Sequence, residues 1–190
     1  MRIAICGGTF DPFHRGHIEP LQAVRGRMQW DRIVYVPAWR QPFKADSATT
    51  SGYHRMAMVA LAIRDDDALF VSPVELERGG TSYSVETLEA MHRLYPGSEF
   101  DWIIGDDNIA QFDRWKDPDR LLKLARFVVL TRSAAAAPDA RFAYARNAAV
   151  PVSATDIRRR VRAGQPIDHL VDPLVSRYIH HYGLYKEGHS

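Results

Sequence analysis

Short apolar runs that alternate with longer segments constrain the fold of this chain more than any other feature. The runs lie at residues 2–6, 32–36, 68–72, 100–105 and 126–131. Each is nearly all apolar, as expected of strands that are buried on both faces of a sheet. Because helical segments separate these strands, we expect an α/β fold, with a doubly wound parallel sheet covered on both sides.

The segments between the runs carry helical signals. Helices are expected at about residues 16–28, 53–64 and 84–95. In the second of these, apolar residues recur at helical spacing. Ser84 is a candidate N-cap of the third, which Pro96-Gly97 would end. Residues 37–51 are rich in Pro, Ser, Thr and Ala and predict a long loop, a type of segment that often carries function.

The chain changes character after Arg132. Residues 133–149 have no clear periodicity and predict a surface excursion. A short strand starting at Val150 is expected to lead into a helix that Ser153 caps. A last helix is expected at about residues 172–181. Since no repeat or domain boundary is visible, residues 1–190 are predicted to form a single domain.

Composition excludes some classes of protein. Hydrophobic residues make up 46% of the chain and charged residues 25%, as in ordinary globular proteins. A net charge of +2 is too small to argue for binding to nucleic acid or membranes. No run is long enough to span a bilayer, and the N-terminus lacks a signal-peptide pattern. With a single cysteine, Cys6, the chain suits a reducing compartment, so we expect a cytoplasmic protein.

The string GGTFDPFHRGH, residues 7–17, follows the first predicted strand. In open α/β sheets, ligands bind at the carboxyl ends of the strands. Glycines there allow the backbone to approach a phosphate, and the N-terminus of the next helix favours an anion. The string is neither a Walker loop nor a G-x-G-x-x-G loop. A plain strand-to-helix turn with incidental histidines is the alternative.

The two histidines of this string, His14 and His17, lie three residues apart and would share a face of the helix start. They could move protons, bind a metal or stabilise charge. A zinc site is not favoured, because the chain has no H-E-x-x-H motif and only one cysteine. Beside a glycine loop, imidazoles are better suited to donating hydrogen bonds to phosphate oxygens.

The motif His14-x-Gly16-His17 resembles the signature of the nucleotidyltransferase superfamily, and the longer string is similar to that of the bacterial nicotinate mononucleotide adenylyltransferases. Further segments resemble this family in the same order: 77–84 with Thr87-Leu88, 103–107, 112–115, 152–158 and 178–185. The resemblance spans nearly the whole chain. It implies a Rossmann-like nucleotidyltransferase fold with a small C-terminal helical part, at about residues 149–190, that completes the ATP site.

The resemblance also implies a reaction. The phosphate of nicotinate mononucleotide attacks the α-phosphorus of ATP, pyrophosphate leaves, and nicotinate adenine dinucleotide enters NAD biosynthesis. A phosphate monoester has its second pKa near 6, so the nucleophile is mostly dianionic at neutral pH and gains little from a general base. Positioning and charge neutralisation matter more. We expect Mg²⁺ to be held mainly by ATP and water, with no protein metal ligands.

Site residues follow from the matching positions. The expected catalytic residues are His14, His17, Lys44 and Arg158. The expected ATP-binding residues are Gly7, Gly8, Thr9, Phe10, His14, His17, Gly105, Asp107, Ser153, Thr155 and Arg158. The expected mononucleotide-binding residues are Thr9, Lys44, Tyr83, Ser84, Trp115 and Lys116. The chain departs from the family in one place, because Phe43 precedes Lys44 where the family commonly has histidine.

Each of these positions also has an ordinary structural explanation. Asp107 could accept hydrogen bonds from ribose hydroxyls, or it could be an acidic residue at a helix N-terminus, which the helix dipole favours. Ser153 and Arg158 could bind an anion or form a helix cap with a solvated basic face, which residues 159–162 continue. Trp115 could stack on a substrate ring or pack in the core.

Other functions stay open at this stage. The acceptor could be nicotinamide mononucleotide, phosphopantetheine or a cytidylyl-transfer substrate. The chain could instead be a non-catalytic nucleotide sensor, or bind nucleic acid through residues 158–162, although its near-balanced charge argues against the latter. The sequence leaves open a homo-oligomer, the strictness of acid over amide, the effect of Phe43, and whether the 37–51 loop becomes ordered on binding.

Overall fold

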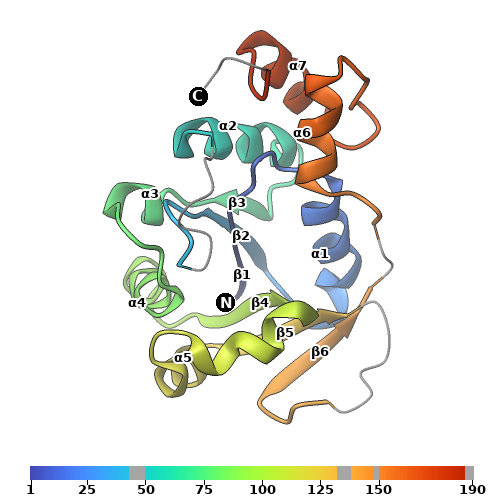
Figure 1. The fold of residues 1–190 in the computed structure, drawn as a ribbon. Coiled ribbons are helices and arrows are strands. Elements are labelled where there is room, and N and C mark those ends of the chain that lie inside the picture. Colours follow the sequence, from blue (N-terminus) through green and yellow to red (C-terminus); the bar gives the residue numbers. More distant parts are fainter. Residues whose placement is uncertain (43–49, 132–137, 148–149, 187–190) are drawn as a thin grey trace.

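A six-stranded parallel sheet forms the centre of the molecule (Figure 1). The computed structural model describes residues 1–42, 50–131, 138–147 and 150–186. The strands are β1 (Arg2–Gly8), β2 (Arg32–Pro37), β3 (Leu69–Val71), β4 (Glu99–Gly105), β5 (Arg126–Thr131) and β6 (Phe142–Arg146). Their order is β3-β2-β1-β4-β5-β6, with every neighbouring pair parallel. Strands β2 and β3 are added on one side of β1, and strands β4 to β6 on its other side, so the order of strand addition reverses between β1 and β4. This reversal confirms the doubly wound prediction.

Helices lie on both faces of this sheet (Figure 1). They are α1 (Arg15–Met28), α2 (Gly52–Ile63), α3 (Val74–Arg78), α4 (Ser84–Leu94), the 3₁₀ helix η1 (Asp106–Arg114), α5 (Pro118–Leu124), α6 (Ala154–Arg162) and α7 (Pro173–His181). Among the described residues, no helix is both long and apolar enough to cross a membrane.

Alternation along the strands produces two separate halves of the core. In β1, Ala4 packs into one half, while its neighbours Ile3 and Ile5 pack into the other. Helices α1, α2, α6 and α7 contribute to the half that contains Ala4, and α4 and α5 to the opposite half. Because successive side chains of a strand point to opposite faces, strands buried on both sides must be nearly all apolar.

The structure corrects part of the C-terminal prediction. Residues 133–149 were expected to form a surface excursion, but Phe142–Arg146 is strand β6, paired in parallel with β5. As an edge strand it is only partly buried, so it lacks the continuous apolar pattern of the central strands. The strand expected at Val150 is absent from the described residues, and Pro151 has no N–H to donate there.

Helix α3 was not predicted, the bounds of η1 and α5 between β4 and β5 were not predicted, and helix α4 begins differently from the prediction. Its N-cap residue is Tyr83, and Ser84 is its first residue. The cap of α6 agrees with expectation, because the Ser153 hydroxyl accepts the Asp156 N–H. In α7, the Asp172 carboxylate caps the helix by accepting the Leu174 N–H.

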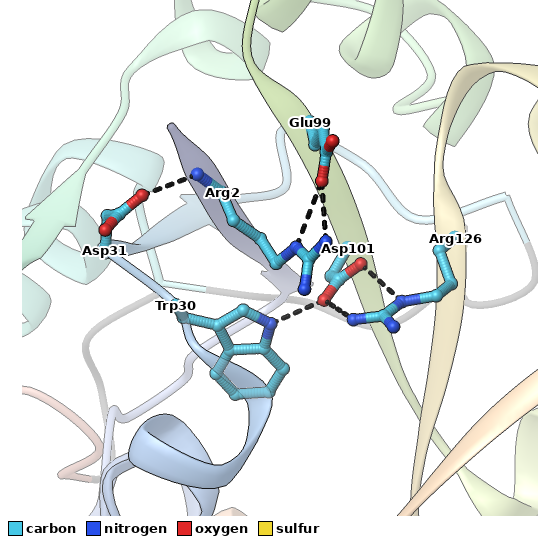
Figure 2. Close-up of polar contacts among 6 residues, drawn as sticks. All are labelled: Arg2, Trp30, Asp31, Glu99, Asp101 and Arg126. Atoms are coloured by element: carbon cyan, nitrogen blue, oxygen red, sulfur yellow. Dashed lines mark hydrogen bonds and ion pairs between the residues drawn. The ribbon is translucent and has the colours of Figure 1, made fainter.

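A polar network joins the amino ends of the strands (Figure 2). Asp101 of β4 is only 2% exposed, and its carboxylate accepts hydrogen bonds from Trp30 Nε1 at 2.6 Å and from Arg126 Nε and Nη2 at 2.8 and 2.5 Å. Beside it, Arg2 pairs with Glu99 at 2.7 Å. These contacts satisfy a buried charge at the edge of the sheet away from the carboxyl ends of the strands.

Candidate active site

A cavity of about 960 Å³ lies at the carboxyl ends of β1 and β4, where the sheet reverses its order. Open α/β sheets bind ligands at this position. The predicted residues that line it are Gly7, Gly8, His17, Tyr83, Ser84, Gly105, Asp107, Trp115 and Lys116. The cavity therefore joins two groups that the sequence had placed far apart, the glycine string and the expected mononucleotide segments.

Six other predicted residues that the structure describes do not line the cavity. Thr9, Phe10 and His14 belong to the loop after β1, while Ser153, Thr155 and Arg158 lie at the start of α6. Phe10 is buried and packs edge-on against the His17 ring, with 5.1 Å between ring centroids, so it supports His17 from the core side. Lys44 and Phe43 lie outside the described residues.

The loop after β1 has a tight backbone. Phe10 adopts a left-handed conformation, with φ of 55°, which is unfavourable for a bulky residue. A Cβ atom on Gly8 would lie 2.7 Å from Phe10 Cε1, so a side chain there would displace the buried ring. Gly8 is therefore required by close packing and also lines the cavity.

The two histidines form a stacked pair, with ring centroids 3.7 Å apart and an interplanar angle of 20°. The backbone N–H of His14 donates to His17 Nδ1 at 3.2 Å. Since Nδ1 accepts this bond, the neutral His17 ring carries its proton on Nε2. A Cβ atom on Gly16 would lie 3.0 Å from two atoms of the His14 ring, so glycine at this position makes room for the pair.

Burial keeps both imidazoles neutral. Desolvation lowers the pKa of His14 to about 4, and His14 is only 7% exposed. Desolvation, together with the nearby His14, holds the pKa of His17 well below its usual range. Neither ring carries a positive charge at pH 7 in the absence of ligand, and each neutral ring still has one N–H to donate.

The other half of the cavity is formed by the start of α4 and the end of η1. Trp115 packs against Phe112 with ring centroids 5.7 Å apart and also lines the cavity. Lys116 Nζ lies 4.4 Å from the centroid of the Tyr83 ring and pairs with Glu86 at 2.6 Å. This end of the cavity thus combines aromatic rings with a lysine ammonium that Glu86 pairs, an arrangement that can stack a flat ring and reach a carboxylate on it.

Two polar residues in this half were missed by the sequence analysis. Glu75 is buried and accepts the Thr87 hydroxyl at 2.5 Å, and burial raises the pKa of its carboxyl group. The Ser82 hydroxyl accepts the backbone N–H of Trp39 at 2.9 Å. Both line the cavity. Glu75 lies in the first turn of α3, a short helix that was not predicted, so its carboxylate gave no signal in the sequence.

Arg158 reaches from α6 to the loop after β1. Its Nη1 donates to the carbonyl of Asp11 at 2.5 Å, and its Nη2 to the Thr155 hydroxyl at 3.4 Å. Arg159 and Arg160 instead pair with Asp156 on their own helix, as the structural explanation predicts. Of these three arginines, Arg158 is therefore the one tied to the predicted site.

Arg55 of α2 was also missed, although it is almost fully buried. Its guanidinium donates to three backbone carbonyls: Thr9 at 2.6 Å, Ala38 at 2.6 Å and Thr50 at 2.9 Å. These carbonyls lie after β1, after β2 and just before α2. Arg55 therefore fixes the spacing of three chain segments near the site, a role that helical periodicity does not reveal.

Among the residues that the structure describes, no three His, Cys, Asp or Glu side chains gather closely enough to hold a metal ion.

Comparisons with known proteins match this geometry. The cytidylyltransferase-like family model matches residues 5–160, which include every residue that lines the cavity. "Probable nicotinate-nucleotide adenylyltransferase" from Gemmatimonas aurantiaca is 38% identical over 98% of this chain and 93% of its own. The protein of the same name from Methylacidiphilum infernorum is 35% identical over 97% of this chain and 92% of its own.

The chain belongs to the nicotinate-nucleotide adenylyltransferase family. A solved structure titled "Plasmodium falciparum nicotinic acid mononucleotide adenylyltransferase complexed with NaAD" superposes with a TM-score of 0.76. It is 22% identical and covers 97% of both chains, so this likeness concerns the fold. In this adenylyltransferase fold, one cavity is lined by the glycine string and by two other segments, which contain Tyr83 with Ser84 and Trp115 with Lys116.

Proposed function

We propose that this chain transfers the adenylyl group of ATP to nicotinate mononucleotide in NAD biosynthesis. The products are nicotinate adenine dinucleotide and pyrophosphate. The observation that carries the proposal is the single cavity, since it joins a phosphate-type glycine loop to an aromatic and cationic end. A reaction between two nucleotides needs one space that holds both, in line for displacement.

The nucleotide end would hold ATP. Gly7 and Gly8 allow the backbone to approach the phosphates, and His17 offers its Nε2–H as a hydrogen-bond donor. Asp107, just past β4, is placed to accept hydrogen bonds from a ribose. Ser153, Thr155 and Arg158, at the start of α6, remain our proposed phosphate contacts from the C-terminal part.

The chemical step needs donors more than a base. A phosphate oxygen of the mononucleotide forms a bond to the α-phosphorus of ATP, and the bond from that phosphorus to the β-phosphate oxygen breaks. The nucleophile is already largely dianionic near neutral pH. We assign His14 and His17 to hydrogen bonding that stabilises the transition state, and Arg158 to fixed positive charge. Lys44, outside the described residues, is proposed as a further fixed positive charge.

The other end would hold the pyridine ring and its carboxylate. We assign Tyr83 and Trp115 to the ring, and Ser84 and Lys116 to the carboxylate. The support is that all four line the cavity and that Lys116 Nζ lies over Tyr83. Ser84 also opens helix α4, whose first N–H groups favour an anion.

Mg²⁺ would arrive with ATP as part of the substrate, bound mainly by phosphate oxygens and water. The partners that we propose are therefore these two nucleotides, with no nucleic acid and no membrane. We place the reaction in the cytoplasm, where both nucleotides are available and the Cys6 thiol stays reduced.

Pyrophosphate release tests the proposed function. Purified protein with MgATP should release pyrophosphate when nicotinate mononucleotide is added, and should form the matching dinucleotide. Replacing ATP with CTP should abolish release. Binding of ATP without release for any mononucleotide would instead identify a nucleotide sensor, and release with phosphopantetheine would assign a different acceptor.

A further inference from the structure

The carboxylate of Asp11, in the loop after β1, is only 5% exposed and is held from two distant parts of the chain. The hydroxyl of Tyr185 donates to Oδ1 at 2.6 Å, and the backbone N–H of Thr50 donates to Oδ2 at 3.1 Å. The carbonyl of the same residue accepts Arg158 Nη1 at 2.5 Å. Asp11 therefore connects the loop that leads to the histidine pair with three remote segments.

Backbone strain is present at both ends of the Asp11–Tyr185 contact. Phe10, next to Asp11, has φ of 55°, and Tyr185 itself has φ of 65°. Bulky residues adopt this left-handed conformation only where the surrounding structure holds them there. The hydrogen bond between Asp11 and Tyr185 joins two strained points of the chain, one beside the site and one in the turn after α7.

The turn that carries Tyr185 is anchored. Leu184 is buried, and its N–H donates to the carbonyl of Ile179 in α7 at 3.0 Å. Helix α7 lies beside α2, as Figure 1 also shows. Burial, with the charge of Asp11, raises the pKa of Tyr185 above its usual range, so the hydroxyl keeps its proton and remains a donor.

We propose that Tyr185 is a positioning residue for adenylyl transfer, which acts through Asp11 to hold the loop that leads to His14 and His17. This inference rests on the proposed function. Tyr185 does not line the cavity, so its effect on the reaction passes through the loop. A misplacement of about 1 Å in a reacting group can cost on the order of 10²-fold in rate.

The test is Tyr185→Phe, which removes the hydroxyl and keeps the ring. We expect kcat to fall about tenfold or more, with KM for both nucleotides within about twofold, because the loop loses alignment rather than binding groups. Tyr178→Phe is the matched control. Its hydroxyl bonds to His54 Nδ1 at 2.8 Å, in the same region but away from the loop. We expect its kcat to equal that of the wild type.

A double-mutant cycle separates positioning from general stability. If Tyr185 acts through Asp11, Tyr185→Phe should lower kcat little further in an Asp11→Ala background, which has no side-chain acceptor for the hydroxyl. Full additivity, an unchanged kcat in Tyr185→Phe, or an equal loss in both tyrosine variants would overturn the proposal.

Hydrogen exchange provides a readout that does not depend on activity. The peptide covering residues 7–17 should exchange faster in Tyr185→Phe than in the wild type and in Tyr178→Phe. Unchanged exchange would contradict the loop contact. If the wild type released no pyrophosphate, the proposed function would fail, while the exchange result would still decide whether Tyr185 holds the loop.

Discussion

At the scale of single residues, the hydrogen bond from the His14 N–H to His17 Nδ1 decides which nitrogen of His17 carries the proton. With Nδ1 occupied, the neutral ring can donate from Nε2 but has no free lone pair for accepting a proton. The sequence left open whether these histidines act as bases, metal ligands or donors. The geometry favours donors.

His17→Ala is expected to lower kcat by about 10²-fold or more, the scale for losing one donor to a transition state. Steady-state pyrophosphate release with both substrates saturating measures it. His181→Ala is a suitable control, since His181 is exposed on α7. An unchanged kcat in His17→Ala would remove His17 from the mechanism.

The buried histidines should also make stability depend on pH. Burial lowers the pKa of His14 to about 4, whereas an unfolded histidine titrates near 6.5. Between these values the unfolded chain binds more protons than the folded one, so the free energy of unfolding falls as pH falls. From pH 6.5 to 5, His14 alone accounts for about 2 kcal/mol, at about 1.4 kcal/mol per pKa unit.

Urea unfolding of wild type and His14→Gln at pH 7 and pH 5 measures this effect. The variant should lose less stability than the wild type between the two pH values, whatever its stability at pH 7. His181→Gln, at an exposed position, should keep the wild-type dependence. Parallel pH dependences for wild type and His14→Gln would show that His14 is not the group responsible.

At the scale of elements, the four central strands were predictable because burial on both faces forces nearly continuous apolar runs. The edge strand β3 was predictable as well, because its residues, Leu69–Val71, are all apolar. Strand β6 was not, since an edge strand is partly exposed and its sequence, Phe142–Arg146, mixes alanine and arginine with aromatics. Short helices such as α3 and α5 have too few turns to show a period.

The candidate site was predictable only where motifs carry it. Motifs predicted residues at both ends of the cavity: the glycine string at one end, and the segments with Tyr83 and with Trp115 at the other. Arg55, Glu75 and Tyr185 were missed because each acts through contacts across the fold: three carbonyls, a buried hydroxyl and a distant carboxylate. No local pattern encodes such contacts.

At the scale of the whole molecule, the two edges of the sheet differ in role. The carboxyl ends of the strands carry the cavity, and the amino ends carry the polar network around Asp101 (Figure 2). This arrangement separates groups that stabilise the sheet from groups that we propose to act on substrates.

Asp101→Ala should therefore lower stability without changing KM for either nucleotide. The change leaves Trp30 Nε1 and Arg126 without their acceptor, which we expect to cost about 2 kcal/mol, since the half-exposed Arg126 can turn to water. Glu99→Ala, at the exposed partner of Arg2, is the control and should change stability little. Chemical unfolding and steady-state kinetics measure both quantities, and a raised KM would contradict the separation.

The most direct test of the account compares the acid and amide mononucleotides in the pyrophosphate-release assay. At the aromatic end of the cavity, the first N–H groups of α4 and the Lys116 ammonium, which lies over Tyr83 and pairs with Glu86, should favour a carboxylate. We expect kcat/KM for nicotinate mononucleotide to exceed that for nicotinamide mononucleotide by about tenfold or more, the effect of one charge-assisted hydrogen bond. Equal values, or a preference for the amide, would contradict the proposed substrate.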